Sequence, residues 1–198
     1  MQLDILEFFV LSWPLPTTQP PSGQQGFWLL HQFDNVFLMR LALFEPDIPQ
    51  NTGTILRLAA CMAVAVDIIE PCGFPFSDRG LRRAGMDYLD QVEMKRHISF
   101  EDFNSWRTAA DYRLILLSTK AQQSFADFEF MTRDILILGR ESAGVPDSVF
   151  AASDSQLHIP MPGGLRSLNV AVAAAIALGE ALRQTGAFAA VLDNGIGG

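Results

Sequence analysis

The stretch HIPMPGGLRSLNVAVAAAIALGEALRQTG, residues 158–186, decides the fold of this chain. It starts with the end of a strand and continues through a loop with a proline and two glycines at 162–164. An alanine-rich helix is then predicted over Leu168–Thr185. Gly186 stands where a helix C-terminal glycine belongs. The stretch therefore predicts a strand–loop–helix unit.

Polar residues stand at the start of this helix. Ser167 or Asn169 can cap its first turn, where unpaired N–H groups and the helix dipole favour an electron-rich group. The two glycines of the loop permit close approach of a ligand to the backbone. Taken alone, the turn is either a structural connection or part of a ligand site.

Short apolar runs alternate with helical patterns from Met39 onward. The predicted strands are Arg40–Phe44, Val66–Glu70, Arg113–Ser118, Asp134–Leu138 and Gln156–Ile159. The predicted helices are Thr52–Ala63, Asp78–Ala84, Ser99–Ala110, Asp147–Ala152 and Leu168–Thr185. Because the strands are almost continuously apolar, they fit parallel strands covered on both faces. The pattern predicts an open, mainly parallel α/β sheet with ligands beyond the strand C-termini.

The chain of 198 residues is 49% hydrophobic and 18% charged, which suits one domain with a sizeable core. Residues 1–38 differ from the rest, because they contain four prolines and a linker-like segment. We expect 1–38 to be a poorly ordered extension, or the upstream translation of a gene that starts at Met39. The domain is then 39–198.

Membrane and metal sites are not predicted. The longest apolar run of the last helix, Val170 to Leu178, is nine residues and too short to span a bilayer. The N-terminus lacks the basic region of a secretory signal. Cys61 is predicted to be a small core residue, and the isolated histidines form no zinc pattern. These features predict a soluble cytoplasmic protein without a metal.

The net charge of −8 argues against a nucleic-acid partner. However, the segment 79–96 holds five basic residues against three acidic ones. The basic residues are Arg79, Arg82, Arg83, Lys95 and Arg96. This basic segment is either a solvated face or part of an RNA-binding surface.

A second candidate segment, FEPDIPQNTGTILR, covers residues 44–57. A strand ends, two prolines hold a loop, and Asn51 or Thr52 is predicted to cap a helix. Arg57 lies about 200° around that helix from Ile55, which belongs to the apolar stripe. Arg57 is therefore either a surface arginine or a side chain that faces a cleft.

A third segment, ILGRESAGVP, covers residues 137–146. Gly139 allows a ligand to approach the end of a buried strand, and Glu141 is placed at the same edge. The alternative is a tight turn with a solvated glutamate. All three segments follow strand C-termini, which favours a shared site. No phosphate-binding glycine motif is present.

The motifs EPDIPQNTGTILRLAA, IIEPCGFPFSDRGLRRAGMDY, LLSTK, LGRESAGVP, HIPM and RSLN occur in this order. Together they resemble the SPOUT superfamily of RNA methyltransferases. Within it, the chain is similar to the TrmL-type tRNA (cytidine/uridine-34) 2′-O-methyltransferases. The resemblance extends from Met39 to Gly186.

The resemblance implies a deep trefoil knot in the C-terminal part of the sheet, a homodimer, and S-adenosylmethionine as cofactor. By motif position it implies cofactor contacts from Leu117, Gly139, Ile159 and Ser167. The implied catalytic residues at the reacting ribose are Asn51, Arg57, Glu141, Ser167 and Asn169.

The substrate implied by the resemblance is the anticodon stem-loop of a tRNA, methylated at wobble position 34. Arg82, Arg83 and Arg166 are then expected to bind RNA. Because arginine is essentially never neutral, we expect Arg57 to hold a phosphate and stabilise charge on the 2′-oxygen. Two alternatives stay open: a 2′-O-methyltransferase for another tRNA or rRNA position, and a knotted RNA-binding protein without catalysis.

Overall fold

The computed structural model describes residues 39–76 and 92–188. The predicted extension 1–38 and the predicted helix Asp78–Ala84 lie outside the described residues. The same is true of Arg79, Arg82 and Arg83 in the basic segment.

The described chain forms a seven-stranded sheet in the order β3-β2-β1-β6-β4-β7-β5, and every strand pair in it is parallel. The strands are β1 (Arg40–Phe44), β2 (Ala65–Ile69), β3 (Met94–His97), β4 (Arg113–Leu117), β5 (Gln123–Ser124), β6 (Asp134–Leu138) and β7 (Ser155–His158). This confirms the predicted open α/β sheet and all five predicted strands to within one or two residues at their ends.

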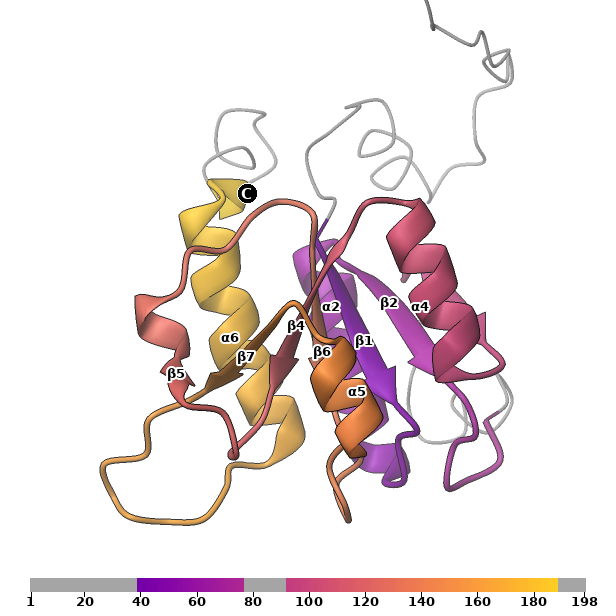
Figure 1. Cartoon of the computed structure of the whole chain (residues 1–198), viewed down its shortest axis with the longest axis horizontal. Helices are drawn as coiled ribbons and strands as arrows, with labels where there is room; N and C mark the ends of the chain where they lie inside the picture. Colours follow the sequence, from indigo (N-terminus) through magenta and orange to yellow (C-terminus); the bar gives the residue numbers. More distant parts are fainter. Residues whose placement is uncertain (1–38, 77–91, 189–198) are drawn as a thin grey trace, which may run out of the picture. The chain divides into compact units, whose positions relative to one another are not determined.

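Four α-helices of the described chain cover the sheet. They are α2 (Pro49–Met62), α4 (Phe100–Ala109), α5 (Asp147–Ala152) and α6 (Val170–Gln184), and a short 3-10 helix, η2 (Phe125–Asp127), follows β5. In Figure 1, α4 and α5 lie in front of the sheet, and α2 and α6 lie behind it. No helix in the described ranges is long and apolar enough to cross a bilayer.

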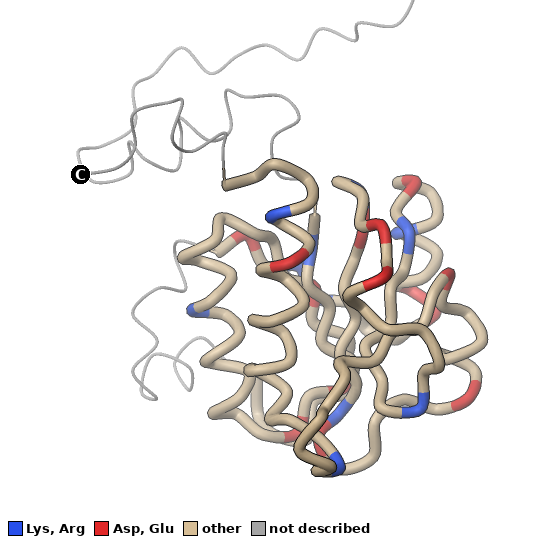
Figure 2. The backbone as a smooth tube through the Cα atoms, turned by 90° about the vertical axis from the view of Figure 1, so that its left-hand side faces the viewer, with Lys and Arg blue, Asp and Glu red and all other residues tan. Residues whose placement is uncertain are grey.

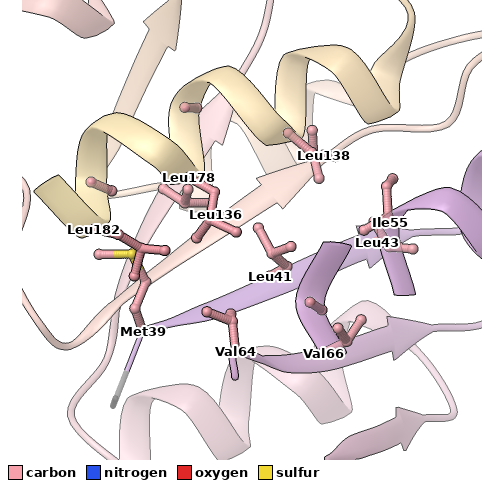
Figure 3. Close-up of a cluster of buried hydrophobic side chains, with 14 of the residues drawn as sticks. Met39, Leu41, Leu43, Ile55, Val64, Val66, Leu136, Leu138, Leu178 and Leu182 are labelled. Carbon is pink, nitrogen blue, oxygen red and sulfur yellow. The ribbon is translucent and has the colours of Figure 1, made fainter. Parts of the chain in front are cut away.

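Successive side chains along the central strands point to opposite faces of the sheet and pack into two separate cores. Leu41 and Leu43 of β1 pack with α2 and α6 on one face, together with Leu136 and Leu138 of β6 (Figure 3). Their neighbours Ala42 and Phe44 belong to the other core, with Phe103 of α4 and Val149 of α5. Because both faces are covered, the central strands are apolar at successive positions.

Two strands were not predicted. β3 contains Lys95 and Arg96, and β5 has only two residues. Both stand at the ends of the strand order, so each pairs on one side only. A strand at an edge can carry polar side chains, and the apolar pattern that identifies central strands is then missing.

The strand C-termini gather the loops that contain the three candidate segments. The arrows of β1, β2 and β4 in Figure 1 point to the lower edge, where the connections after β4, β6 and β7 lie. The prediction that these segments share one edge of the sheet is confirmed, as expected for a parallel α/β sheet.

Candidate active site

A cavity of about 570 Å³ opens at this edge of the sheet. Its walls are the ends of β4, β6 and β7, the loops that follow them, and the first turns of α2 and α6. The volume lies in the range of small-molecule sites. Seven of the predicted site residues line it: Asn51, Leu117, Gly139, Glu141, Ile159, Ser167 and Asn169.

A chain of hydrogen bonds links three of these residues across the cavity wall. The Asn169 amide nitrogen donates to Asn51 Oδ1 at 3.0 Å, and Asn51 Nδ2 donates to Glu141 Oε1 at 2.9 Å. Glu141 Oε2 accepts the backbone N–H of Asp47 at 3.2 Å. Both carboxylate oxygens of Glu141 therefore serve to hold other groups in place.

Asn169 connects this series of hydrogen bonds to the start of α6. Its Oδ1 accepts from the backbone N–H groups of Ala171 and Val172, at 2.9 and 3.4 Å. The prediction that Asn169 caps this helix is confirmed, and a cap of this kind contributes about 0.5–2 kcal/mol. Ser167 does not cap the helix, and its hydroxyl makes no hydrogen bond within the described chain.

The predicted cap of α2 is wrong. The helix begins at Pro49, with Ile48 as its N-cap and no side-chain cap. Proline is well suited to the first helical position, because its missing N–H would be unpaired there in any case. Asn51 is thus inside the first turn, which leaves its amide free to bridge Glu141 and Asn169.

Gly139 closes the loop after β6. A Cβ at this position would lie 2.6 Å from the carbonyl carbon of Gly144, so only glycine fits. Arg140 and Gly144 exchange backbone hydrogen bonds of 3.0 and 2.7 Å across the same turn. The close approach predicted for Gly139 is therefore made by its own loop. Gly144 has a positive φ of 70°, which glycine adopts without strain.

Arg140 connects this loop to the end of β1. Its guanidinium pairs with Glu45, a residue with φ of 43°. Its Nε–H is buried and has no hydrogen-bond partner among the described residues. Arg140 also lines the cavity. The cavity wall therefore contains an unsatisfied cationic donor.

Two predicted site arginines lie outside the cavity. Arg57 is exposed on α2, six positions after Asn51. Arg166 lines a second, adjoining hollow with Thr119 and His158. The structure thus brings the cofactor-motif residues together and leaves the arginines at the surface.

The described part of the basic segment makes contacts within the chain. Arg96 pairs with Glu70 at 2.6 Å, and Lys95 Nζ lies 4.0 Å from the ring centre of Trp106. The predicted contacts of Arg82 and Arg83 lie outside the described residues.

Several lining residues were not singled out from the sequence. They include Ile48, Thr119, Lys120, Arg140, Ser142 and Val145. All of them belong to the three quoted segments or to the LLSTK motif. The rule that ligands bind beyond strand C-termini would have found these loops, but it does not select the side chains that point inward. Among the described residues, no group of three or more His, Cys, Asp or Glu side chains could hold a metal ion.

The fold and this cavity define a cofactor-sized site in a parallel α/β domain, and comparison with known proteins identifies the family. The sequence profile of the SpoU rRNA Methylase family matches residues 38–179. The chain belongs to this family. The resemblance to RNA methyltransferases is confirmed.

Three individual relatives of the chain, one compared by sequence and two by structure, are named for methyl transfer to RNA. A tRNA (cytidine(34)-2′-O)-methyltransferase from Beijerinckia indica subsp. indica is 61% identical over 153 residues, covering 77% of this chain and 96% of the relative. A structure solved for the 2-OH methylation of C/U34 on tRNA has a TM-score of 0.69 and 40% identity, and covers 74% of this chain and 95% of the other. An AdoMet-bound rRNA methyltransferase from Sinorhizobium meliloti has a TM-score of 0.65 and 26% identity, over 73% of this chain and 56% of the other.

Proposed function

We propose that this chain transfers a methyl group from S-adenosylmethionine to the ribose 2′-hydroxyl of the tRNA wobble nucleotide. The target is position 34, as cytidine or a modified uridine. The observation that carries the proposal is one cavity lined by residues of all three candidate segments. The relative with 61% identity is named for this reaction at cytidine 34.

The residues of the cavity fit S-adenosylmethionine. Leu117, Leu138 and Ile159 offer apolar surface at the strand ends, and Gly139 and Gly144 line the cavity beside them. The unpaired Nε–H of Arg140 suits the carboxylate of the methionine part. A structural relative is AdoMet-bound. The bound cofactor supplies an electrophilic methyl group.

The chain's own residues then have to position the ribose. The Ser167 hydroxyl makes no hydrogen bond within the described chain, so it is available to the ribose. Asn51 and Asn169 are held by each other and by Glu141. Because both Glu141 oxygens already accept hydrogen bonds, Glu141 orders the site instead of taking the 2′-hydroxyl proton. Alignment of this kind supplies up to about 7–11 kcal/mol in ideal cases.

Arg57 is proposed to hold an RNA phosphate and stabilise developing charge on the 2′-oxygen. It is exposed, as contact with a large substrate requires. Arg166, in the adjoining hollow, is proposed to bind RNA together with Arg82 and Arg83. Because such contacts release counterions, the affinity for tRNA should fall steeply with salt.

A homodimer, a C-terminal trefoil knot and a cytoplasmic location complete the proposal. The outer side of α6 exposes Val172 and Ile176, and Leu165 before it is 77% exposed. Figure 2 shows few charged positions along the long helices: α2 carries Arg57, and α6 carries Glu180 and Arg183. A neutral, partly apolar surface suits a second copy. In support of the knot, α6 follows β7 but returns to pack on β6 and α2.

The decisive experiment is transfer of labelled methyl from S-adenosylmethionine to bulk tRNA, with nuclease digestion and mass spectrometry to locate the product. We expect a 2′-O-methyl group at position 34. Arg57→Ala should lower transfer about 100-fold or more, whereas Arg57→Lys should retain part of it. Exposed Asp127, which does not line the cavity, provides the control Asp127→Ala with wild-type transfer.

The other outcomes separate the alternatives. Methylation at another tRNA position or in rRNA would keep the reaction and change the substrate. Cofactor binding without transfer to any RNA would favour an RNA-binding protein that has lost catalysis. Sedimentation of Ile176→Glu tests the dimer, because a buried charge should yield monomers.

A further inference from the structure

Two loops that are 94 positions apart in the sequence hold each other through reciprocal hydrogen bonds. The Asp47 carboxylate accepts the backbone N–H of Glu141 at 3.2 Å and the hydroxyl of Ser142. In return, the Glu141 carboxylate accepts the backbone N–H of Asp47 at 3.2 Å. Each acidic side chain thus binds the backbone of the other, and we call Asp47, Glu141 and Ser142 the clamp.

We propose that Asp47 is a positioning residue of the methyl transfer, which acts by fixing Glu141 and, through it, Asn51 and Asn169. The inference rests on the proposed function and deepens it. Asp47 does not line the cavity, whereas Glu141, Ser142 and Asn51 do. Its effect therefore reaches the reacting groups through the clamp.

The hydrogen-bond pattern explains why the effect is transmitted. Glu141 is the acceptor for the Asn51 amide, and Asn51 is the acceptor for the Asn169 amide. If Asp47 is removed, the Glu141 N–H and the Ser142 hydroxyl lose their acceptor. The Glu141 side chain still accepts the backbone N–H of residue 47, but its loop is held less firmly, and the two asparagines lose part of their fixed orientation.

The clamp is supported from behind by the segment that follows β2. The backbone N–H of Gly73 donates to the carbonyl of Pro46 at 2.9 Å. A Cβ on Gly73 would lie 2.7 Å from the Asp47 Cβ and 2.9 Å from its Cα. Gly73→Ala therefore displaces Asp47 without altering its carboxylate, which gives a second, independent way to disturb the clamp.

The low pKa of Asp47 keeps its carboxylate ionised, as its role as a hydrogen-bond acceptor in the clamp requires. The side-chain contact with Glu141, the hydroxyl of Ser142 and the backbone N–H groups of both residues hold the pKa of Asp47 at about 2. The carboxylate therefore stays charged under all conditions in which the enzyme is assayed. Loss of Asp47 should leave the shape of the pH–rate profile between pH 6 and 9 unchanged.

The experiment compares Asp47→Ala, Ser142→Ala and the double variant, with Asp127→Ala as a charge-matched control. Steady-state transfer to tRNA and calorimetric binding of S-adenosylmethionine are both measured. For Asp47→Ala we expect kcat to fall about 10- to 100-fold, because two hydrogen bonds to a charged group are lost. The KM for tRNA should stay near that of the wild type, because Asp47 is outside the cavity. Ser142→Ala should have a smaller effect.

The double variant tests the mechanism. Because Ser142 acts through Asp47, the double variant should be no slower than Asp47→Ala, whereas independent effects would multiply. Asp47→Asn keeps one oxygen acceptor and should restore part of kcat. Gly73→Ala should lower kcat in the same way as Asp47→Ala and again spare the KM for tRNA.

Several results would overturn the proposal. One is wild-type kcat and cofactor affinity in both Asp47→Ala and Gly73→Ala; another is multiplicative losses in the double variant. A lower melting temperature with unchanged kcat in Asp47→Ala would show a structural role only. If the wild type binds cofactor but methylates no RNA, the proposed function fails. Weaker cofactor binding by Asp47→Ala would then still support the clamp, and unchanged binding would reject it.

Discussion

Two polar clusters of the molecule are each held together by hydrogen bonds to a carboxylate, but one is buried and the other borders a cavity. Inside the sheet, Asp67 pairs with Arg40 Nε at 2.7 Å and lies 2.8 Å from His97 Nε2, and these residues are between 0% and 6% exposed. At the sheet edge, Glu141 binds Asn51 and Asp47 beside an open cavity. Each cluster has a carboxylate as its central acceptor.

The difference between the two clusters is what surrounds the acceptor. Arg40, Asp67 and His97, which we call the inner cluster, come from the neighbouring strands β1, β2 and β3 and are covered by Trp106, 5.1 Å from the Arg40 guanidinium. These residues are buried within the described chain, so their hydrogen bonds stabilise the sheet. The hydrogen bonds that join Glu141, Asn51 and Asn169 link separate loops, and these three residues line a cavity. In this molecule only the carboxylate cluster that borders open space lines the candidate site.

The largest expected effect is on stability, from Asp67→Ala. This change leaves the buried His97 Nε2 without its partner and leaves Arg40 with Glu93 alone, which costs up to about 3–5 kcal/mol. Urea unfolding should show the loss, while kcat of the folded fraction stays at the wild-type value. A loss of kcat without a loss of stability would contradict the distinction between the two clusters.

Gly139→Ala should have the next largest effect. Its Cβ would lie 2.6 Å from backbone of Gly144, so the turn must open. Overpacking of this kind costs about 1–3 kcal/mol, and cofactor affinity measured by calorimetry should fall as well. Gly163→Ala is the stability control, because a Cβ there meets nothing within 4 Å. Equal stability of the two variants would disprove the close contact.

Asn169 separates the structural part of the edge cluster from its functional part. Asn169→Ala removes the cap of α6 and should cost about 0.5–2 kcal/mol. Asn169→Asp keeps the acceptor for Ala171 and Val172 but loses the donor to Asn51. We expect the aspartate variant to unfold like the wild type in urea and to transfer methyl about tenfold more slowly. Wild-type transfer would show that the link to Asn51 is not needed.

The smallest effect is the pH dependence of Asp47. Its pKa in the folded state is about 2, below the usual value of about 3.9 in an unfolded chain. The ionised side chain therefore stabilises the protein above about pH 4, and this contribution disappears as the pH falls towards 2. The unfolding free energies of wild type and Asp47→Asn should differ by less than about 1 kcal/mol at pH 6, because the carboxylate is partly exposed. The difference should shrink at pH 3; a constant difference would argue against the clamp.

The sequence predicted the bounds of those strands that are buried on both faces. β1 and β6 have the predicted bounds, because central parallel strands are apolar on both faces. The start of α2 was missed because Asn51 is a common cap, whereas here it bridges two loops. Cys61 was expected in the core but is exposed. It follows Arg57 by one helical turn, so it shares the outer side of α2.

The sequence predicted which loops form the candidate site, but not all of the contacts between them. Motif resemblance selected Asn51, Glu141 and Asn169, and the structure links them by hydrogen bonds. The role of Asp47 was not predictable, because its partners lie 94 and 95 positions away. No local pattern encodes a contact at that separation.

The strand order also determines when the site can form as the chain leaves the ribosome. Arg40 of β1 pairs with Ala65 only 25 positions later, but on its other edge it pairs with Ile135, 95 positions later. Pairing between distant segments is slow, because loop closure precedes the stabilising contacts. β1, β2 and β3 can assemble during synthesis, while the second edge of β1 waits for β6. Asn169 emerges later still, so the cavity at the sheet edge is among the last features of the domain to be completed.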